Sequence, residues 1–190
     1  MAGSDHDAED AADGELAVLA AAGDAEAFAA LAGRHRELMY GVCRRITCDD
    51  QDALDALQEA LLVAWRRIGS FEGRSAVSTW LFRVAANAAI DEVRRRSRRP
   101  PYADAAPADL PAAHDIEGDA VTKSTVDWAL AQLPPQFRAA VVLREYCDFS
   151  YQEIAEVMDV PVDTVKSRIS RGRQALADLL VPSFRPGRPT

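Results

Sequence analysis

The chain has 190 residues, of which 48% are hydrophobic and 7% aromatic, and a formal net charge of -8 at pH 7. This length accommodates one ordinary domain or two small ones, and the apolar content supports packed cores. Abundant alanine favours helices, so we expect an all-α protein. The chain has no apolar run long enough to span a membrane and no signal-peptide pattern, which predicts a cytoplasmic protein.

The negative charge is concentrated at the start of the chain. Eight of the 30 acids lie in residues 1–26, which hold no Lys or Arg, and the remaining acids equal the 22 basic residues in number. Basic residues gather in two runs, at 94–99 and 166–173. Each run either binds phosphates or forms a solvated helix face.

Cysteine and histidine are sparse and scattered. Cys43, Cys48 and Cys147 show no C-x-x-C spacing, and the three histidines form no ligand pattern. We therefore expect no disulfide framework, metal site or cofactor. Cys43 and Cys48 are either buried, inert thiols or a redox pair.

The first half of the chain is predicted to form one helical domain over residues 14–98, after a disordered acidic tail at 1–13. Four helices are expected, at about 15–22, 24–46, 52–68 and 78–98, the second and fourth capped by Asp24 and Ser78. Two stripes, apolar apart from His35, should face the core. They consist of Phe28, Leu31, His35, Leu38, Val42 and Ile46 on the second helix, and Leu54, Leu57, Leu61, Ala64, Trp65 and Ile68 on the third.

The second half is predicted to be a separate helical domain. Residues 99–120 are rich in Pro, Ala and Asp and form a flexible linker, and residues 182–190 form a disordered tail. The domain between them, 121–181, should contain helices at about 121–133, 136–146, 151–158 and 162–180. The fold class is thus all-α, with two small helical domains.

The last two helices have the pattern of a helix-turn-helix. Ser150 and Glu153 have capping-box spacing, Ala155 is small enough for a close helix crossing, and Pro161 suits the start of the next helix. The outer side of the second helix then carries basic and hydroxyl side chains that can donate to phosphates and base edges. The alternative is a small bundle with a charged surface.

Both halves resemble bacterial sigma factors. Leu133, Pro134, Arg138, SYQEIAEVM at 150–158 and VPVDTVKSRISRGR at 160–173 resemble the domain that reads promoters. DALQEALLVAW at 55–65, residues 71–74 and TWLFRVAANAAIDEVRR at 79–95 resemble the other domain of the extracytoplasmic-function group of the sigma-70 family, in the same order. Asp159 and Gly172 depart from the pattern, which more often has Gly and Ala.

The resemblance implies roles for matching positions. Polymerase docking would fall on Asp55, Gln58, Glu59, Leu62 and Trp65, although Leu62 and Trp65 also suit a core. The minus-ten element would be bound by Phe71, Gly73, Arg74, Ser75, Asn87, Asp91, Arg94 and Arg95. The minus-thirty-five element would be bound by Thr164, Lys166, Ser167, Ser170, Arg171 and Arg173.

The leading hypothesis is therefore a sigma factor that brings core RNA polymerase to promoter DNA and is held by an anti-sigma partner, which in this family is often membrane-bound. It has no nucleotide-binding or hydrolase motif, so we expect neither catalysis nor a small-molecule substrate. The alternatives are a helix-turn-helix repressor or activator that acts without polymerase, and a regulator that uses these folds for protein contacts only.

Overall fold

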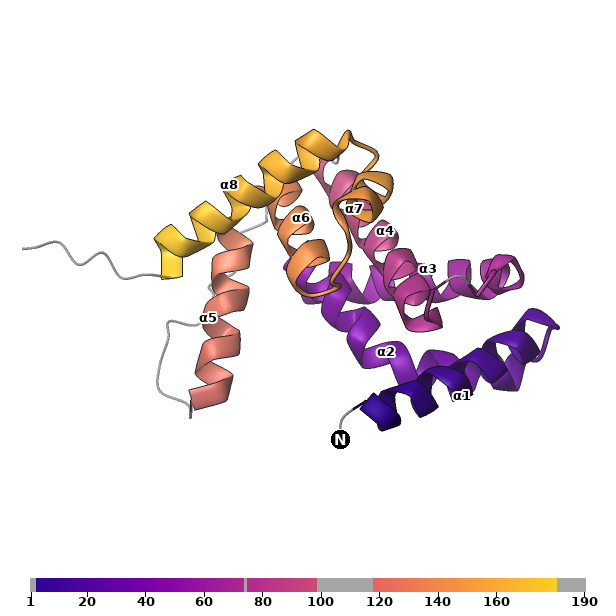
Figure 1. The fold of residues 1–190 in the computed structure, drawn as a ribbon. Helices are drawn as coiled ribbons and strands as arrows, with labels where there is room; N and C mark the ends of the chain where they lie inside the picture. The colour runs from indigo at the N-terminus through magenta and orange to yellow at the C-terminus, as the bar shows by residue number, and fades with distance from the viewer. Residues whose placement is uncertain (1–2, 74, 99–117, 181–190) are drawn as a thin grey trace, which may run out of the picture.

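A computed structural model describes residues 3–73, 75–98 and 118–180 (Figure 1). Within these ranges every regular element is a helix, as expected for an all-α fold. The elements in chain order are α1 (Gly3–Ala21), α2 (Ala25–Thr47), α3 (Asp50–Arg67), the 3-10 turn η1 (Ile68–Ser70), α4 (Val77–Arg98), α5 (Gly118–Gln132), α6 (Pro135–Glu145), α7 (Tyr151–Met158) and α8 (Val162–Leu180).

The N-terminal bundle is built around α2, which packs against α1, α3 and α4. Asp24 caps α2 as predicted, since its carboxylate accepts the backbone N–H groups of Glu26 and Ala27. Asp49 caps α3 in the same way. Helix α2 ends at Cys48, which adopts the left-handed conformation at φ 57° and directly precedes the Asp49 cap of α3.

The first helix begins earlier than predicted. Residues 1–13 were expected to be a disordered tail, whereas α1 starts at Gly3. Asp13 is only 5% exposed, and its carboxylate contacts Arg34 at 2.9 Å and Nε2 of His35 at 2.5 Å. These long-range contacts stabilise a segment whose composition alone predicted disorder.

Both predicted apolar stripes need correction. Leu38 is 47% exposed and Met39 is buried in its place. On α3 the buried side chains are mainly alanines, whereas Leu54 and Trp65 are exposed. Alanine at the contact lets helices approach closely, so the larger residues lie outside the helix crossing. The inward face of α3 consists of Ala53, Ala56, Leu57, Ala60 and Ala64.

Two predicted boundaries also differ. Helix α4 begins at Val77, one residue before the expected cap Ser78, and the carbonyl of Ala76 accepts the Trp80 N–H. Helix α5 begins at Gly118, inside the predicted linker 99–120. The rest of that linker and the predicted tail 182–190 lie outside the described residues.

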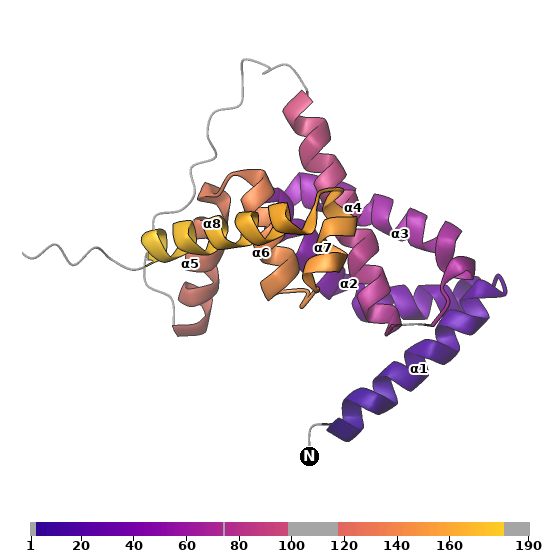
Figure 2. The same cartoon turned by 45° about the horizontal axis from the view of Figure 1, so that its top comes forward.

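Helices α5 to α8 form the second bundle, in which α8 packs on α5, α6 and α7. The two bundles also touch each other, because α6 lies along α2 and α7 lies along α4 (Figures 1 and 2). Phe149, with 1% of its surface exposed, anchors the loop between α6 and α7. The domains therefore make direct contact.

Candidate nucleic-acid interface

The helix-turn-helix consists of α7, a three-residue turn and α8. Ser150 and Glu153 form the predicted capping box, in which each side chain accepts the other residue's backbone N–H. The Ser150 N–H lowers the pKa of the Glu153 carboxyl, because it stabilises the charged form. Asp159 has φ 54° and ψ 56°, the left-handed conformation that favours glycine, the residue more often found at this place in the resembled pattern.

The core of this motif fixes which side of α8 faces outward. Ile154, Ala155, Val165 and Ile169 are buried between the two helices. The opposite side of α8 is accessible, which leaves Lys166, Ser167, Ser170, Arg171 and Arg173 exposed and Thr164 half-buried. The predicted minus-thirty-five residues therefore share one helix, with Thr164 nearest its start.

Two cations on this face are held by carboxylates. Lys166 lies 3.0 Å from Asp163, and Arg173 lies 2.5 Å from Glu145 of α6. Tyr151 borders the same shallow depression as Lys166, Ser170 and Arg173. These exposed ion pairs are weak in water and orient the cations until a phosphate competes for them.

Gly172 lies where α8 crosses α6. A Cβ at this position would be 2.5 Å from Val141 Cγ2 and 3.2 Å from the Phe137 carbonyl oxygen. Alanine, the residue more usual at this place in the resembled pattern, would therefore collide with α6. The glycine allows close packing of α8 and so sets the depth at which the recognition helix lies on its domain.

The outward side of α3 carries four of the five predicted docking residues in a row. Asp55, Gln58, Glu59 and Leu62 are all exposed and border one groove. Trp65 lies one turn further, 38% exposed, with its ring 5.0 Å from that of Phe28. The face thus combines acidic, amide and apolar groups, a composition suited to a protein partner.

Predicted minus-ten residues border the same groove from α4. The groove has a volume of about 760 Å³ and is lined on this side by Asn87, Asp91, Arg94 and Arg95. Arg94 donates to Asp91 at 3.2 Å, and Arg95 pairs with the buried carboxylate of Glu92. The structure thus brings the docking and minus-ten sets to opposite walls of one groove.

The loop before α4 holds the remaining minus-ten residues. The centroid of the Phe71 ring lies 5.8 Å from that of Trp80 in a tilted arrangement, so the Phe71 ring packs against the bundle. Gly73 has φ 68°, a conformation that favours glycine, and no atom lies within 4 Å of where its Cβ would be. Ser75 is exposed, and Arg74 lies outside the described residues.

The sequence patterns did not predict the partners of three arginines. Arg96 binds Asp49 and Asp52, so that part of the acidic side of α3 is already neutralised. Arg83 pairs with Glu156, and Arg138 donates to the Ile46 carbonyl. Each contact joins residues at least 44 positions apart. Periodicity within one helix carries no signal for such pairs.

The three cysteines are free thiols. Burial raises the pKa of Cys43 and of Cys147 to about 12 and also raises that of Cys48. All three are therefore protonated and poorly nucleophilic at neutral pH, which favours the inert interpretation. No group of three metal-ligating side chains occurs among the described residues, nor is any helix there long and apolar enough to cross a membrane.

Comparison with known families places sigma-70 region 2 on residues 31–99 and sigma-70 region 4 on residues 125–176. The chain is 39% identical to the RNA polymerase sigma-H factor of Pseudomonas aeruginosa, over 86% of this chain and 91% of that one. It is 39% identical to the ECF RNA polymerase sigma factor SigM of Mycobacterium tuberculosis strain H37Rv, over 88% of this chain and 84% of that one.

Two solved structures share the arrangement of helices. CnrH in complex with the cytosolic domain of CnrY matches with a TM-score of 0.59 and 27% identity, over 89% of this chain and 97% of that one. RpoE in complex with the anti-sigma factor NepR from Bartonella quintana matches with a TM-score of 0.62 and 26% identity, over 78% and 94%.

The two matched regions define a two-domain protein of the sigma-70 type. The similarity to the curated relatives narrows this class further. The chain belongs to the extracytoplasmic-function (ECF) group of RNA polymerase sigma factors.

Proposed function

We propose that this sigma factor divides promoter recognition between its two bundles and docks on core RNA polymerase through the outward face of α3. The observation that supports this assignment best is the groove shared by α3 and α4. Its α3 wall offers an acidic and apolar face, and its α4 wall offers an amide and two guanidinium groups. One wall suits a protein and the other a nucleic-acid strand.

Docking is assigned to Asp55, Gln58, Glu59, Leu62 and Trp65. In free protein these side chains are exposed, so a partner helix can bury Leu62 and Trp65 while the acids at the rim steer its approach. The double variant Gln58→Ala/Glu59→Ala should weaken binding to purified core polymerase about tenfold or more. Glu37→Ala, at an exposed glutamate on α2, is the matched control.

The minus-ten role is assigned to α4 and the loop before it. Asn87 is exposed and offers both a donor and an acceptor to a base edge, while Arg94 and Arg95 suit the backbone phosphates. Asn87→Ala should therefore lower run-off transcription from a duplex promoter. It should lower it less on a template whose minus-ten region is already unpaired, because that template needs no opening.

The minus-thirty-five role is assigned to the outer side of α8. Lys166→Ala/Arg171→Ala should reduce transcription from promoters that depend on this element, whereas Arg36→Ala on α2 should not. A protein that regulates without polymerase would instead bind promoter duplex alone and fail to bind core. Pull-down with core followed by run-off transcription separates the two functions, and failure to bind core would overturn the sigma-factor assignment.

In this proposal the polymerase carries out RNA synthesis and the chain itself catalyses no reaction. The chain acts in the cytoplasm, where the polymerase is. A protein inhibitor is the expected regulator, because the two similar solved structures described above are complexes with another protein, in one case an anti-sigma factor. Such an inhibitor should compete with core for the α3 face. The double variant Gln58→Ala/Glu59→Ala should then weaken capture by both.

A further inference from the structure

Helix α8 presents one continuous line of side chains directly away from its domain. Val165, Ile169 and Gly172 are buried and mark the packed side of the helix. At about 3.6 residues per turn, the opposite line consists of positions that follow one another at steps of four, three and four residues. Its members are Asp163, Ser167, Ser170 and Gln174, and all four are exposed. Asp163 and Gln174 lie outside the set assigned above to the minus-thirty-five element.

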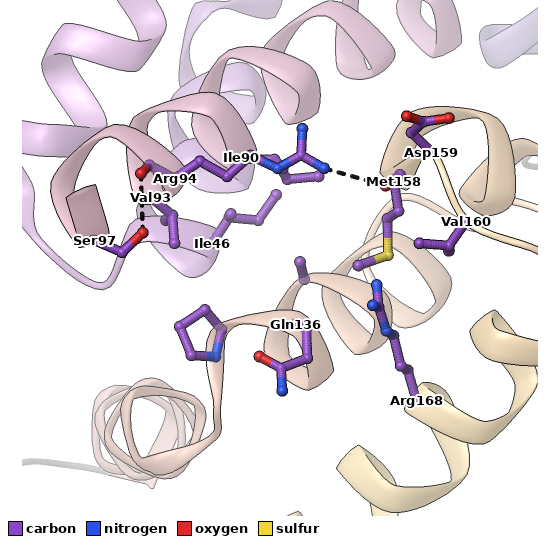
Figure 3. A pocket seen from close by; sticks show the side chains of 12 residues that line it. Ile46, Ile90, Val93, Arg94, Ser97, Gln136, Met158, Asp159, Val160 and Arg168 are labelled. Atoms are coloured by element: carbon purple, nitrogen blue, oxygen red, sulfur yellow. Dashed lines mark hydrogen bonds between the residues drawn. The ribbon is translucent and has the colours of Figure 1, made fainter.

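The cations of α8 lie beside this line and not on it. Lys166 and Arg173 are on one flank, and Arg171 is on the other. The side chain of Arg168 points away from the line, into a cavity of about 390 Å³ that Met158 also lines (Figure 3). In DNA the phosphates border the major groove and the base edges form its floor. The flanking cations therefore suit phosphates, and the line between them faces the bases.

Asp163 places a carboxylate at the start of this line. It is the second residue of α8, and the first residues of a recognition helix are those that contact base edges. Its side chain is 91% exposed, and its Oδ1 lies 3.0 Å from Nζ of Lys166. An ionised carboxylate accepts hydrogen bonds and cannot donate them. In the major groove it therefore favours a base that offers a donor.

The next residue of the line is also an acceptor. The hydroxyl of Ser167 donates to the Thr164 carbonyl at 2.9 Å, so its proton is used within the helix and its lone pairs stay available. Two neighbouring acceptors favour the bases with an exocyclic amino group, which are cytosine and adenine. The carboxylate is matched best by cytosine, because adenine sets its N7 acceptor beside the amino group, where N7 repels the second carboxylate oxygen.

Lys166 offsets the repulsion that the carboxylate of Asp163 meets near DNA. An isolated carboxylate in the groove is repelled by the phosphates on both sides. The ammonium group of Lys166 neutralises it at 3.0 Å. Because an ammonium group has three donors, Lys166 can share itself between Asp163 and a phosphate. The ion pair thus allows an acid to lie between the phosphate-binding flanks.

We infer that Asp163 is a specificity-determining residue: it selects cytosine at one position of the minus-thirty-five element by accepting a hydrogen bond from the N4 amino group. This inference rests on the role proposed above for α8. The cations on the flanks then supply affinity for any sequence, whereas the acid between them supplies the preference for one base.

The variant Asp163→Asn tests the choice of base. It removes one charge, keeps the shape of the side chain and turns one acceptor into a donor. Asparagine pairs with N6 and N7 of adenine, so the preferred base at that position should change from cytosine to adenine, with a preference of about tenfold. Asp163→Ala should lose the preference and gain no other. Asp178→Asn makes the same charge change at an exposed position about 22 Å further along α8 and is the matched control.

Holoenzyme assembled from core polymerase and the full chain provides the readout. A duplex library randomised over both promoter elements is selected by binding to holoenzyme, and the bound sequences are counted. An acid in the first turn also stabilises its helix, so Asp163→Asn should lower the thermal stability slightly. Lower stability weakens binding to all sequences alike. A change of preferred base at one position therefore reports a contact and not a structural role.

Three results would overturn the role of Asp163. They are equal base preferences for wild type and Asp163→Asn, a change spread over the whole element, and a wild-type preference for a base other than cytosine at the position that responds. If wild type still selected sequences in the minus-thirty-five element in these cases, only this inference would fail. If wild type failed to bind core, or its holoenzyme selected no sequence in that element, the proposed function itself would fail.

Discussion

At the residue scale, Gly172 determines how closely α8 can approach α6. Its missing side chain leaves room for Val141, which is 3% exposed and has a stiff, β-branched side chain. A methyl group added here would have to displace the Val141 side chain or the Phe137 backbone. Glycine's usual cost in a helix, about 1 kcal/mol, is therefore offset by packing.

Gly172→Ala should destabilise the protein although alanine is the better helix former. Overpacking costs about 1–3 kcal/mol, which exceeds the gain in helix propensity. Gly33→Ala, with open space at its Cβ, should instead stabilise by about 0.5–1 kcal/mol. Urea denaturation of both variants measures the difference, and a gain in stability for Gly172→Ala would contradict the close approach.

The buried thiols should make stability fall in alkaline solution. Cys43 and Cys147 have a pKa of about 12 in the folded chain against an ordinary value of 9.0. Above pH 9 the unfolded chain loses these protons first, so stability decreases between pH 9 and 12 and is unaffected by the thiols below that window. At pH 10 the loss should be about 1–1.5 kcal/mol per thiol.

Denaturation at pH 7.5 and pH 10 of wild type and of Cys43→Ala/Cys147→Ala measures this contribution. The variant should lose less stability between the two pH values than wild type. Equal losses would mean that the thiols ionise as readily in the folded chain as in the unfolded one. The same measurement tests whether they are inert.

Much of the residue-level structure could be predicted where the interaction is local. The caps at Asp24 and Ser150 each depend on a few neighbouring residues. The exposure of Leu38 and the burial of Met39 could not be predicted in this way. Which of two adjacent apolar positions on a helix is buried depends on where the neighbouring helices lie.

At the scale of elements, the capping box fixes the start of α7 and thus the orientation of the helix-turn-helix. Ser150→Ala should cost about 1 kcal/mol of stability, whereas Ser150→Asp, which can also cap, should retain most of it. Thermal unfolding compares the two. If Ser150→Asp were as unstable as Ser150→Ala, the effect would come from something other than the cap.

Helix types and most boundaries could be predicted, because periodicity and caps lie within each element. The start of α1 could not. Residues 3–13 lack the large apolar groups that usually mark order, and the buried pair of Asp13 with His35 joins positions 22 apart. That Asp55, Gln58, Glu59 and Leu62 share one side of α3 could be predicted from their spacing. That the charge of the nearby Asp52 is neutralised could not, because this depends on Arg96 of α4.

At the scale of the whole molecule, net charge opposes DNA binding by the free chain. With a formal charge of -8 and its basic helix face partly paired, the protein should bind a promoter duplex weakly alone. Affinity should rise by at least about a hundredfold when core polymerase is added, because both bundles are then held on the DNA together.

Fluorescence anisotropy with a labelled promoter duplex checks this expectation. Lys166→Ala should lower the affinity of the complex and reduce the slope of log affinity against log salt by about 1. Arg36→Ala serves as the control. Equal affinity with and without core would favour a regulator that acts without polymerase.

The two-domain organisation could be predicted from the sequence, whereas the packing of one bundle on the other could not. That packing depends on pairs such as Arg83 with Glu156, 73 positions apart, and Arg138 with Ile46, 92 positions apart. Neither pair has a spacing or composition that marks it. The docking and minus-thirty-five sets could each be placed on one helix from the sequence, because the residues of each set lie within a single element.

The contact of Gly172 with Val141 also constrains how related sequences can diverge. A relative with alanine at the position of Gly172 must shrink the side chain opposite or move its helices apart. We therefore expect the two positions to covary: glycine with valine, and alanine with alanine or glycine. In this chain Val141→Ala should act as a genetic suppressor of Gly172→Ala, although each substitution alone is harmful.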